Sequence, residues 1–298
     1  MTRKQFIKII GPLPKKIKLK PLILELADCG NYIKEKIEYY VEANEKVRAY
    51  LLRPKNRQTK TPAIFCHHQH ASNYKLGKSE MVGLAGNPNL AYAKELAERG
   101  YIAFAPDAVA FEERNWHDNS WWGTEYFELA SRLLKGQTLL AKVLHDISVG
   151  INYLSERPEV DGKKIGFIGH SYGGRMALIA PAFDKRIKVA VSNCYCLNLK
   201  TSLNKAAAVR IPMEFCVPNI LKHGDIEDII KLAEPASLYI SAATDDKWSQ
   251  DAKKIYNYAK PAFLKGELKL KIWRGNHVFS KQMRQSAYQF LDKYLCVQ

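Results

Sequence analysis

The sequence predicts an α/β protein whose central sheet is mostly parallel and is covered by helices on both faces. Short apolar runs alternate with longer amphipathic stretches, a pattern typical of strand-helix-strand units. The chain has 298 residues, 47% of them hydrophobic, which is enough to bury one large core. We therefore expect a single domain over residues 31–298, with an N-terminal extension, residues 1–30, packed on it.

The candidate elements follow one another in a regular order. Two β-rich runs, 32–41 and 46–52, are joined by a polar Ala-Asn-Glu turn and predict an antiparallel hairpin. Candidate parallel strands follow at 63–68, 101–107, 164–170, 187–195, 237–243 and 269–275. Amphipathic helical patterns cover 89–99, 122–157, 173–183, 251–263 and 281–295.

Two stretches interrupt this alternation, at about 111–126 and 198–235. The first holds three tryptophans beside several charged residues, and the second separates two predicted strands. Open α/β sheets bind ligands beyond the carboxyl ends of their strands. We expect both excursions to lie over that edge.

Charge and cysteine content exclude some classes of protein. The formal net charge is +16, but the lysines are scattered, and the densest basic run, 15–20, has no interleaved aromatic residues. This predicts a solvated basic surface and no nucleic-acid partner. The N-terminal apolar stretches are short and interrupted by charge, so we expect neither a signal peptide nor a membrane span, and a cytoplasmic location. The six cysteines lack regular spacing, and we expect most to be reduced and buried.

The sharpest motif is the run from Gly169 to Gly174, Gly-His-Ser-Tyr-Gly-Gly, which fits G-x-S-x-G. It follows a predicted strand and precedes a predicted helix. A nucleophile elbow needs this context, because the turn that exposes its serine is too tight for side chains at the flanking positions. The pattern predicts Ser171 as a nucleophile.

A serine hydroxyl needs a base and a third group that orients the base. In this arrangement the chain order is serine, acid, histidine. His277 follows the last predicted strand and is favoured over His223, which lies in the second excursion. For the acid, a loop after the strand 237–243 offers Asp246, which is favoured, and Asp245 as the alternative.

Acyl transfer also needs backbone N–H donors for the developing oxyanion. Tyr172, directly after the serine, supplies one, and His68 or Gln69 after the first parallel strand supplies the second. The same loop allows a rival interpretation in which His67, His68 and His70 bind zinc or iron. Since neighbouring strand residues point to opposite sides and no carboxylate completes the pattern, we expect no metal site. Cys194 and Cys196 are expected to be core residues.

The chain also resembles a known family. The resemblance lies in residues 67–115, which begin His-His-Gln-His and end Phe-Glu-Glu-Arg-Asn, and in 169–178, 215–235, Asp245-Asp246 and Gly275-Asn276-His277. These segments resemble the dienelactone hydrolase and acetyl xylan esterase-like branch of the α/β-hydrolases. The resemblance covers about residues 45–295. It implies an α/β-hydrolase fold with about eight strands, hydrolysis of an ester or similar acyl bond, no cofactor, and Ser171 and His277 as nucleophile and histidine.

This chain departs from the family pattern at two places. Ala243 replaces a common glycine and Lys-Trp-Ser-Gln follows the acid, which affects the choice of aspartate. True dienelactone hydrolases use a cysteine nucleophile, so the serine argues against that substrate.

The first excursion carries further candidates. Asp107 and Glu112 to Arg114 are expected to form an internal ion-pair network, with substrate contacts by Glu113 or Arg114 as the alternative. The aromatic residues Trp116, Trp121, Trp122 and Tyr172 could line a substrate pocket or simply pack in the core.

These observations predict a cytoplasmic serine hydrolase, a carboxylesterase or deacetylase, that acts on a small ester or acylated molecule without a cofactor. A peptidase or an acyltransferase could use the same three residues. The rival from another class is a binding protein with this fold that has lost turnover.

Overall fold

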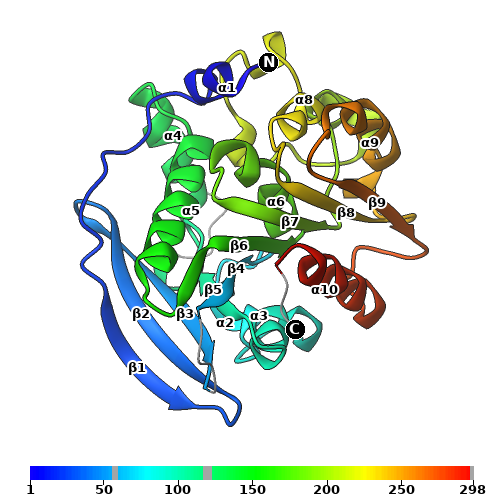
Figure 1. The fold of residues 1–298 in the computed structure, drawn as a ribbon. Helices are drawn as coiled ribbons and strands as arrows, with labels where there is room; N and C mark the ends of the chain where they lie inside the picture. Colours follow the sequence, from blue (N-terminus) through cyan, green and yellow to red (C-terminus); the bar gives the residue numbers. More distant parts are fainter. Residues whose placement is uncertain (56–59, 117–122, 296–298) are drawn as a thin grey trace.

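The structure, a computed structural model, describes residues 1–55, 60–116 and 123–295 (Figure 1). Within these residues, nine strands form one sheet in the order β1-β2-β3-β5-β4-β6-β7-β8-β9. The strands are β1 (Leu22–Asp28), β2 (Tyr32–Glu42), β3 (Glu45–Pro54), β4 (Thr61–His67), β5 (Ile102–Pro106), β6 (Val160–His170), β7 (Ile187–Asn193), β8 (Ser237–Ala243) and β9 (Leu268–Trp273). The α-helices are α1 (Arg3–Ile9), α2 (Lys78–Met81), α3 (Tyr92–Glu98), α4 (Thr124–Leu134), α5 (Leu139–Glu156), α6 (Tyr172–Phe183), α7 (Leu199–Leu203), α8 (Ile226–Lys231), α9 (Ala252–Ala259) and α10 (Lys281–Leu295).

The strand directions confirm the predicted fold class. β1, β2, β3 and β5 pair antiparallel in that order, whereas β5, β4, β6, β7, β8 and β9 are parallel. Each of the six predicted parallel strands and both strands of the predicted hairpin are present. Because parallel strands end on the same edge of a sheet, the loops after β4, β6, β8 and β9 meet there.

The structure adds one strand to the expected elements and divides one expected helix. The predicted extension, residues 1–30, contains β1, which adds a ninth strand at the edge of the sheet. The helical pattern at 122–157 is two helices within its described part, because Gly136 has a positive φ of 69° and Thr138 then caps α5 by accepting a hydrogen bond from the backbone of Ala141.

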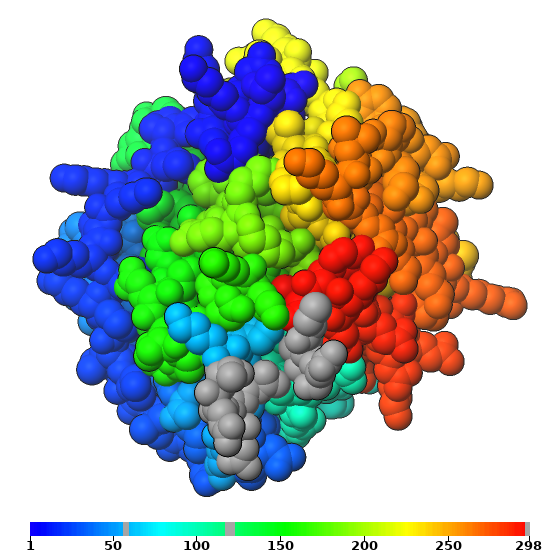
Figure 2. All heavy atoms as spheres, viewed as in Figure 1, coloured from blue at the N-terminus to red at the C-terminus, as the bar shows by residue number. Residues whose placement is uncertain are grey.

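Two hydrophobic clusters cover the two faces of the sheet. Along each buried strand, successive side chains point to opposite faces. Phe65 and Phe167 therefore lie in the cluster with α5, α6 and α9, whereas Ile64 and Ile168 lie in the cluster with α3 and α10. In Figure 2 the first residues, in dark blue, lie at the top beside yellow residues of the second excursion, whereas orange and red residues of the C-terminal part lie on the right.

The C-terminal helix packs closely on the strand that leads to Ser171. A Cβ atom at Gly166 of β6 would lie 2.6 Å from Cδ1 of Ile64 and 3.0 Å from Cδ1 of Leu295, the last residue of α10. Glycine is therefore the residue that lets this helix end approach the strand. In the described part of the chain, none of the helices is both long enough and apolar enough to span a bilayer.

Candidate active site

Ser171 lies in a strained turn between β6 and α6. Its backbone angles are φ 57° and ψ −111°, a conformation that residues with a Cβ adopt rarely. Its N–H donates to the carbonyl of Asn193 at 2.9 Å, and its own carbonyl accepts from the N–H of Arg175 at 2.9 Å. The neighbouring strand and the first helical turn therefore hold the serine in the conformation that the G-x-S-x-G pattern predicts.

Close packing leaves no room for a side chain at the glycines around the serine. A Cβ at Gly169 would lie 2.2 Å from the backbone carbon of Gly173, and one at Gly173 would lie 1.9 Å from the carbonyl oxygen of His67. Real Cβ atoms do not approach other atoms so closely. The turn thus packs directly against the end of β4, which brings the loop from His67 onward next to Ser171.

The loops after β8 and β9 bring an aspartate and a histidine together. His277 Nδ1 lies 2.8 Å from Asp246 Oδ1. The Asp246 carboxylate is buried and also accepts from the backbone N–H of Trp248 and the hydroxyl of Ser249, so its orientation is fixed. When the Nδ1–H of a neutral ring donates to Asp246, Nε2 is left as a proton acceptor. Asp245 is exposed.

Ser171 and His277 line the same cavity, which has a volume of about 330 Å³. Its wall comes from the loop after β4, the start of α4, the turn at Ser171, the second excursion, and the segments that follow β7, β8 and β9. The described lining residues are Gln69, His70, Ala71, Ser72, Tyr74, Glu125, Ser171, Arg175, Tyr195, Arg210, Ile211, Pro212, Met213, Glu214, Trp248 and His277. His223, the alternative base, is exposed and lies outside this group.

The histidine loop after β4 is fixed by hydrogen bonds. The N–H of Ala108 donates to Nε2 of His68 at 3.0 Å, so the ring proton is on Nδ1, which donates to the carbonyl of Gln69 at 2.7 Å. Burial lowers the pKa of His68 to about 4, which keeps this ring neutral near pH 7. His68 therefore orients the peptide group of Gln69 beside the cavity.

The other two histidines are also engaged. The N–H of Ser72 donates to Nδ1 of His70 at 3.0 Å, which leaves Nε2–H to donate to Glu125 at 2.9 Å. The Nδ1–H of His67 donates to the carbonyl of His68 at 3.1 Å. Neither of the two clusters of metal-ligand type within the described residues contains a histidine of this loop. These contacts give the loop a role in shaping the cavity.

The residues of both clusters make contacts with other groups of the protein. Cys194 joins Asp246 and His277, and burial raises the pKa of its thiol to about 12, so the thiol is protonated near pH 7. Its Sγ donates to the carbonyl of Val278 at 3.2 Å. The second cluster, Asp107, Glu112 and Glu113, surrounds a lysine.

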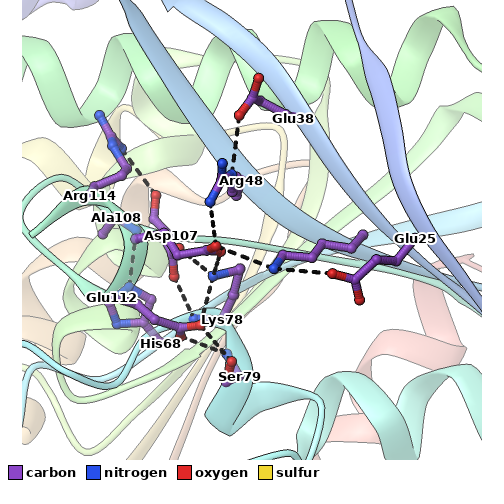
Figure 3. Close-up of polar contacts among 12 residues, drawn as sticks. Glu25, Glu38, Arg48, His68, Lys78, Ser79, Asp107, Ala108, Glu112 and Arg114 are labelled. Atoms are coloured by element: carbon purple, nitrogen blue, oxygen red, sulfur yellow. Dashed lines mark hydrogen bonds and ion pairs between the residues drawn. The ribbon is translucent and has the colours of Figure 1, made fainter.

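That lysine is Lys78, which is completely buried (Figure 3). Its Nζ lies 2.7 Å from Asp107, 2.7 Å from Glu112 and 2.5 Å from Glu113. Burial lowers the pKa of Lys78, but the three carboxylates raise it more, so the net shift is upward. The internal ion-pair network expected for this segment is present, and it fixes the loop that holds His68 through Ala108.

The substrate-contact candidates of the first excursion lie elsewhere. Glu113 pairs with Lys78 and Arg48, and Arg114 pairs with Glu45 and Asp146; neither is among the described residues that line the cavity. Arg114 lines a separate internal cavity of about 20 Å³, room for about one water molecule. Trp116 is exposed and packs on Phe127. Trp121 and Trp122 lie outside the described residues.

The cavity also contains a charged pair that sequence reasoning missed. The buried guanidinium of Arg175 contacts the buried carboxylate of Glu214 and lies 4.8 Å from the ring centre of Tyr172 and 5.1 Å from that of Tyr195. Burial raises the pKa of Glu214. Arg175 follows Ser171 by one helical turn, a spacing that could have identified it. The sequence contains no comparable pattern that points to Glu214.

A second carboxylate of the cavity, Glu125, is held in its charged form. It accepts hydrogen bonds from His70 and from the hydroxyl of Tyr74, the latter at 2.6 Å. Burial raises the pKa of Glu125, but these hydrogen bonds outweigh that effect and lower it. The cavity thus combines a nucleophile candidate with fixed polar and charged groups.

Comparison with known proteins identifies the family of this chain. Residues 47–288 match the model of the dienelactone hydrolase family. "Putative hydrolase YtaP" of Bacillus subtilis (strain 168) is 29% identical over 234 residues, which are 78% of this chain and 76% of that protein. Among solved structures, a glucuronoyl esterase from Solibacter usitatus superimposes with a TM-score of 0.74 at 17% identity, covering 97% of this chain and 91% of that one.

An acetyl xylan esterase from Paenibacillus sp. R4 superimposes with a TM-score of 0.65 at 15% identity, covering 99% of this chain and 100% of that one. At these identities the superpositions establish the α/β-hydrolase fold, and the family match extends over most of the chain. The chain belongs to the dienelactone hydrolase family.

Proposed function

We propose that the protein hydrolyses carboxylic esters, with Ser171 as nucleophile, His277 as general base and Asp246 as the acid that orients it. The observation that carries the proposal is the cavity that Ser171 and His277 share, with His277 held by the buried carboxylate of Asp246 at 2.8 Å. The structural neighbours named above are esterases, which supports the choice of an ester bond over other acyl bonds.

The chemistry follows from these positions. Nε2 of His277 accepts the proton of the Ser171 hydroxyl while the serine oxygen attacks the ester carbonyl. The imidazolium then protonates the departing alcohol, which leaves an acyl group on Ser171. A water molecule, deprotonated by His277, attacks this acyl-enzyme and releases the carboxylic acid and the free serine.

The developing oxyanion needs fixed donors. We assign this role to the backbone N–H groups of Tyr172 and Gln69. Tyr172 directly follows the serine at the start of α6, and Gln69 lines the cavity while His68 holds its carbonyl. His68, the alternative donor, is not among the described residues that line the cavity. Preorganised donors of this kind contribute about 3 to 4 kcal/mol each to transition-state stabilisation.

The first test is the intact mass of the wild type and of Ser171→Ala after exposure to a fluorophosphonate. We expect one adduct on the wild type and none on the variant. An unmodified wild type would contradict the proposal and favour a binding protein without turnover. Parallel assays with p-nitrophenyl acetate, a matched p-nitroanilide and an added alcohol acceptor then distinguish an esterase from a peptidase and an acyltransferase.

A further inference from the structure

An apolar groove lies on the surface formed by the second excursion. Its volume is about 530 Å³, and the side chains that line it include Leu133, Leu199, Leu203, Phe215, Val217 and Ile220. Leu203 is 57% exposed and Leu133 is 37% exposed, although both are aliphatic. Apolar side chains that gather at an exposed surface can form a binding site.

The groove adjoins the catalytic cavity. Ile211 lines both, and it is 43% exposed, so the two spaces adjoin at this side chain. The chain segment that contains it faces the cavity through residues 210–214 and the groove through residues 215–222. A ligand bound in the cavity beside Ile211 therefore lies next to an apolar groove.

Helix α4 gives a second, independent connection. Glu125 in its first turn lines the cavity, and Leu133 near its end lines the groove. Eight residues of α-helix correspond to about 12 Å along the helix axis. This distance is short enough for one extended substrate to occupy both spaces.

We propose that the groove binds an apolar arm of the ester substrate, an alkyl or aromatic group that extends from the ester bond past Ile211. This inference rests on the proposed ester hydrolysis and specifies its substrate class. The polar side of the cavity, with Arg175, Glu125 and Glu214, would contact the other part of the substrate. The occupant would thus be an amphipathic ester with one polar and one apolar side.

The experiment compares two series of esters. In the first, p-nitrophenyl esters carry acetyl, butyryl, hexanoyl and octanoyl groups; in the second, acetate esters carry alcohols of the same lengths, and proton release is measured. We expect kcat/KM to rise by about fourfold per buried methylene in one of the two series. The series that rises identifies the side of the ester bond that carries the arm.

The variants Leu133→Glu and Leu203→Glu place a charge in the groove. We expect each to lower the ratio of octanoyl to acetyl kcat/KM, or the corresponding ratio in the alcohol series, by roughly tenfold. Leu134→Glu is the matched control: Leu134 is 90% exposed, lies next to Leu133 on α4, and is not among the described groove residues, so the ratio should stay at the wild-type value.

The outcomes separate the two proposals. The groove assignment would be wrong if acetyl esters were hydrolysed but kcat/KM did not rise with chain length in either series. It would also be wrong if the groove variants left the ratio of long-chain to acetyl kcat/KM unchanged. The proposed esterase activity would stand in both cases. Failure to hydrolyse any member of either series, with no adduct on Ser171, would overturn the proposed function and the groove assignment together.

Discussion

His277 and Asp246 are joined by a hydrogen bond of 2.8 Å, although 31 positions separate them in the chain. The contact forms because β8 and β9 are parallel neighbours, so that the loops that follow them meet at one edge of the sheet. Asp245 has a different environment: it is exposed, and its N–H donates to the carbonyl of Gly275 at 2.9 Å. Two adjacent aspartates thus have different roles, one oriented towards His277 and one in a surface turn.

The first prediction uses this difference. Asp246→Asn should lower kcat for ester hydrolysis by about 10³ to 10⁴-fold, because an amide stabilises the wrong tautomer of His277. Asp245→Asn should leave kcat near the wild-type value. Steady-state kinetics with p-nitrophenyl acetate, together with circular dichroism to verify folding, makes the comparison. Equal losses in the two variants would contradict the assignment of Asp246.

The second prediction concerns the packing of the turn at Ser171. Gly173→Ala would place a methyl group 1.9 Å from the His67 carbonyl oxygen, so the turn and the end of β4 must separate. We expect a loss of about 1 to 3 kcal/mol in the free energy of unfolding, measured by urea titration, and loss of fluorophosphonate labelling.

Gly162→Ala is the control for this substitution. The atom nearest to its added Cβ lies 3.9 Å away, and the unfolding free energy should change by less than about 0.5 kcal/mol. If the two variants unfolded at the same urea concentration, close packing would not explain why the motif has a glycine at position 173.

The third prediction is a pH dependence of stability. Burial lowers the pKa of His68 from 6.5 to about 4 in the folded protein. Below pH 6.5 the unfolded chain binds a proton that the folded protein does not accept until about pH 4, so stability falls as the pH decreases through this range. Between about pH 7 and about pH 5, this group alone should remove about 2 kcal/mol.

The variant His68→Gln isolates this contribution. A glutamine amide can donate and accept as the neutral imidazole does, but it does not titrate. Burial also lowers the pKa of His67 and of His170, so the variant should keep part of the pH dependence. Urea titrations at both pH values measure the difference. A pH dependence identical to that of the wild type would mean that folding does not lower the pKa of His68.

The fourth prediction concerns the buried ion pairs in Figure 3. Lys78→Met removes the ammonium group among three carboxylates, and we expect a loss of about 3 to 5 kcal/mol in the free energy of unfolding. Lys94→Met, on a lysine that is 48% exposed and lies 4.0 Å from Glu98, should change it by less than about 0.5 kcal/mol. A small loss for Lys78→Met would indicate that the carboxylates become protonated or solvated instead.

The sequence predicted the buried parts of the fold well. The strands β4 to β8 contain short apolar runs, because both faces of this part of the parallel sheet are covered. β1 was missed because its side chains are mostly exposed on both faces, which removes the alternation of a half-buried strand. The break between α4 and α5 was missed although Gly136 and Thr138 are typical of a helix end and a helix start.

For the candidate site, the sequence indicated residues whose place depends on local structure. Ser171 lies in a turn that the motif itself specifies, and the pairing of Asp246 with His277 follows from the ends of neighbouring strands. The contact between Arg175 and Glu214 depends on the path of the second excursion, which no local pattern describes. The same holds for Lys78, whose three carboxylate partners belong to a different loop.

The approach of Leu295 to Gly166 has a consequence for biosynthesis. Ser171, the proposed nucleophile, is translated well before His277, and both His277 and the helix that packs on β6 follow β8 in the chain. A chain released after β8 would contain Ser171 but would lack His277, β9 and the helix α10 that covers one face of the sheet. Premature termination or a proteolytic cut followed by loss of the C-terminal fragment would therefore leave a polypeptide without the proposed base, and with the part of the sheet under α10 exposed.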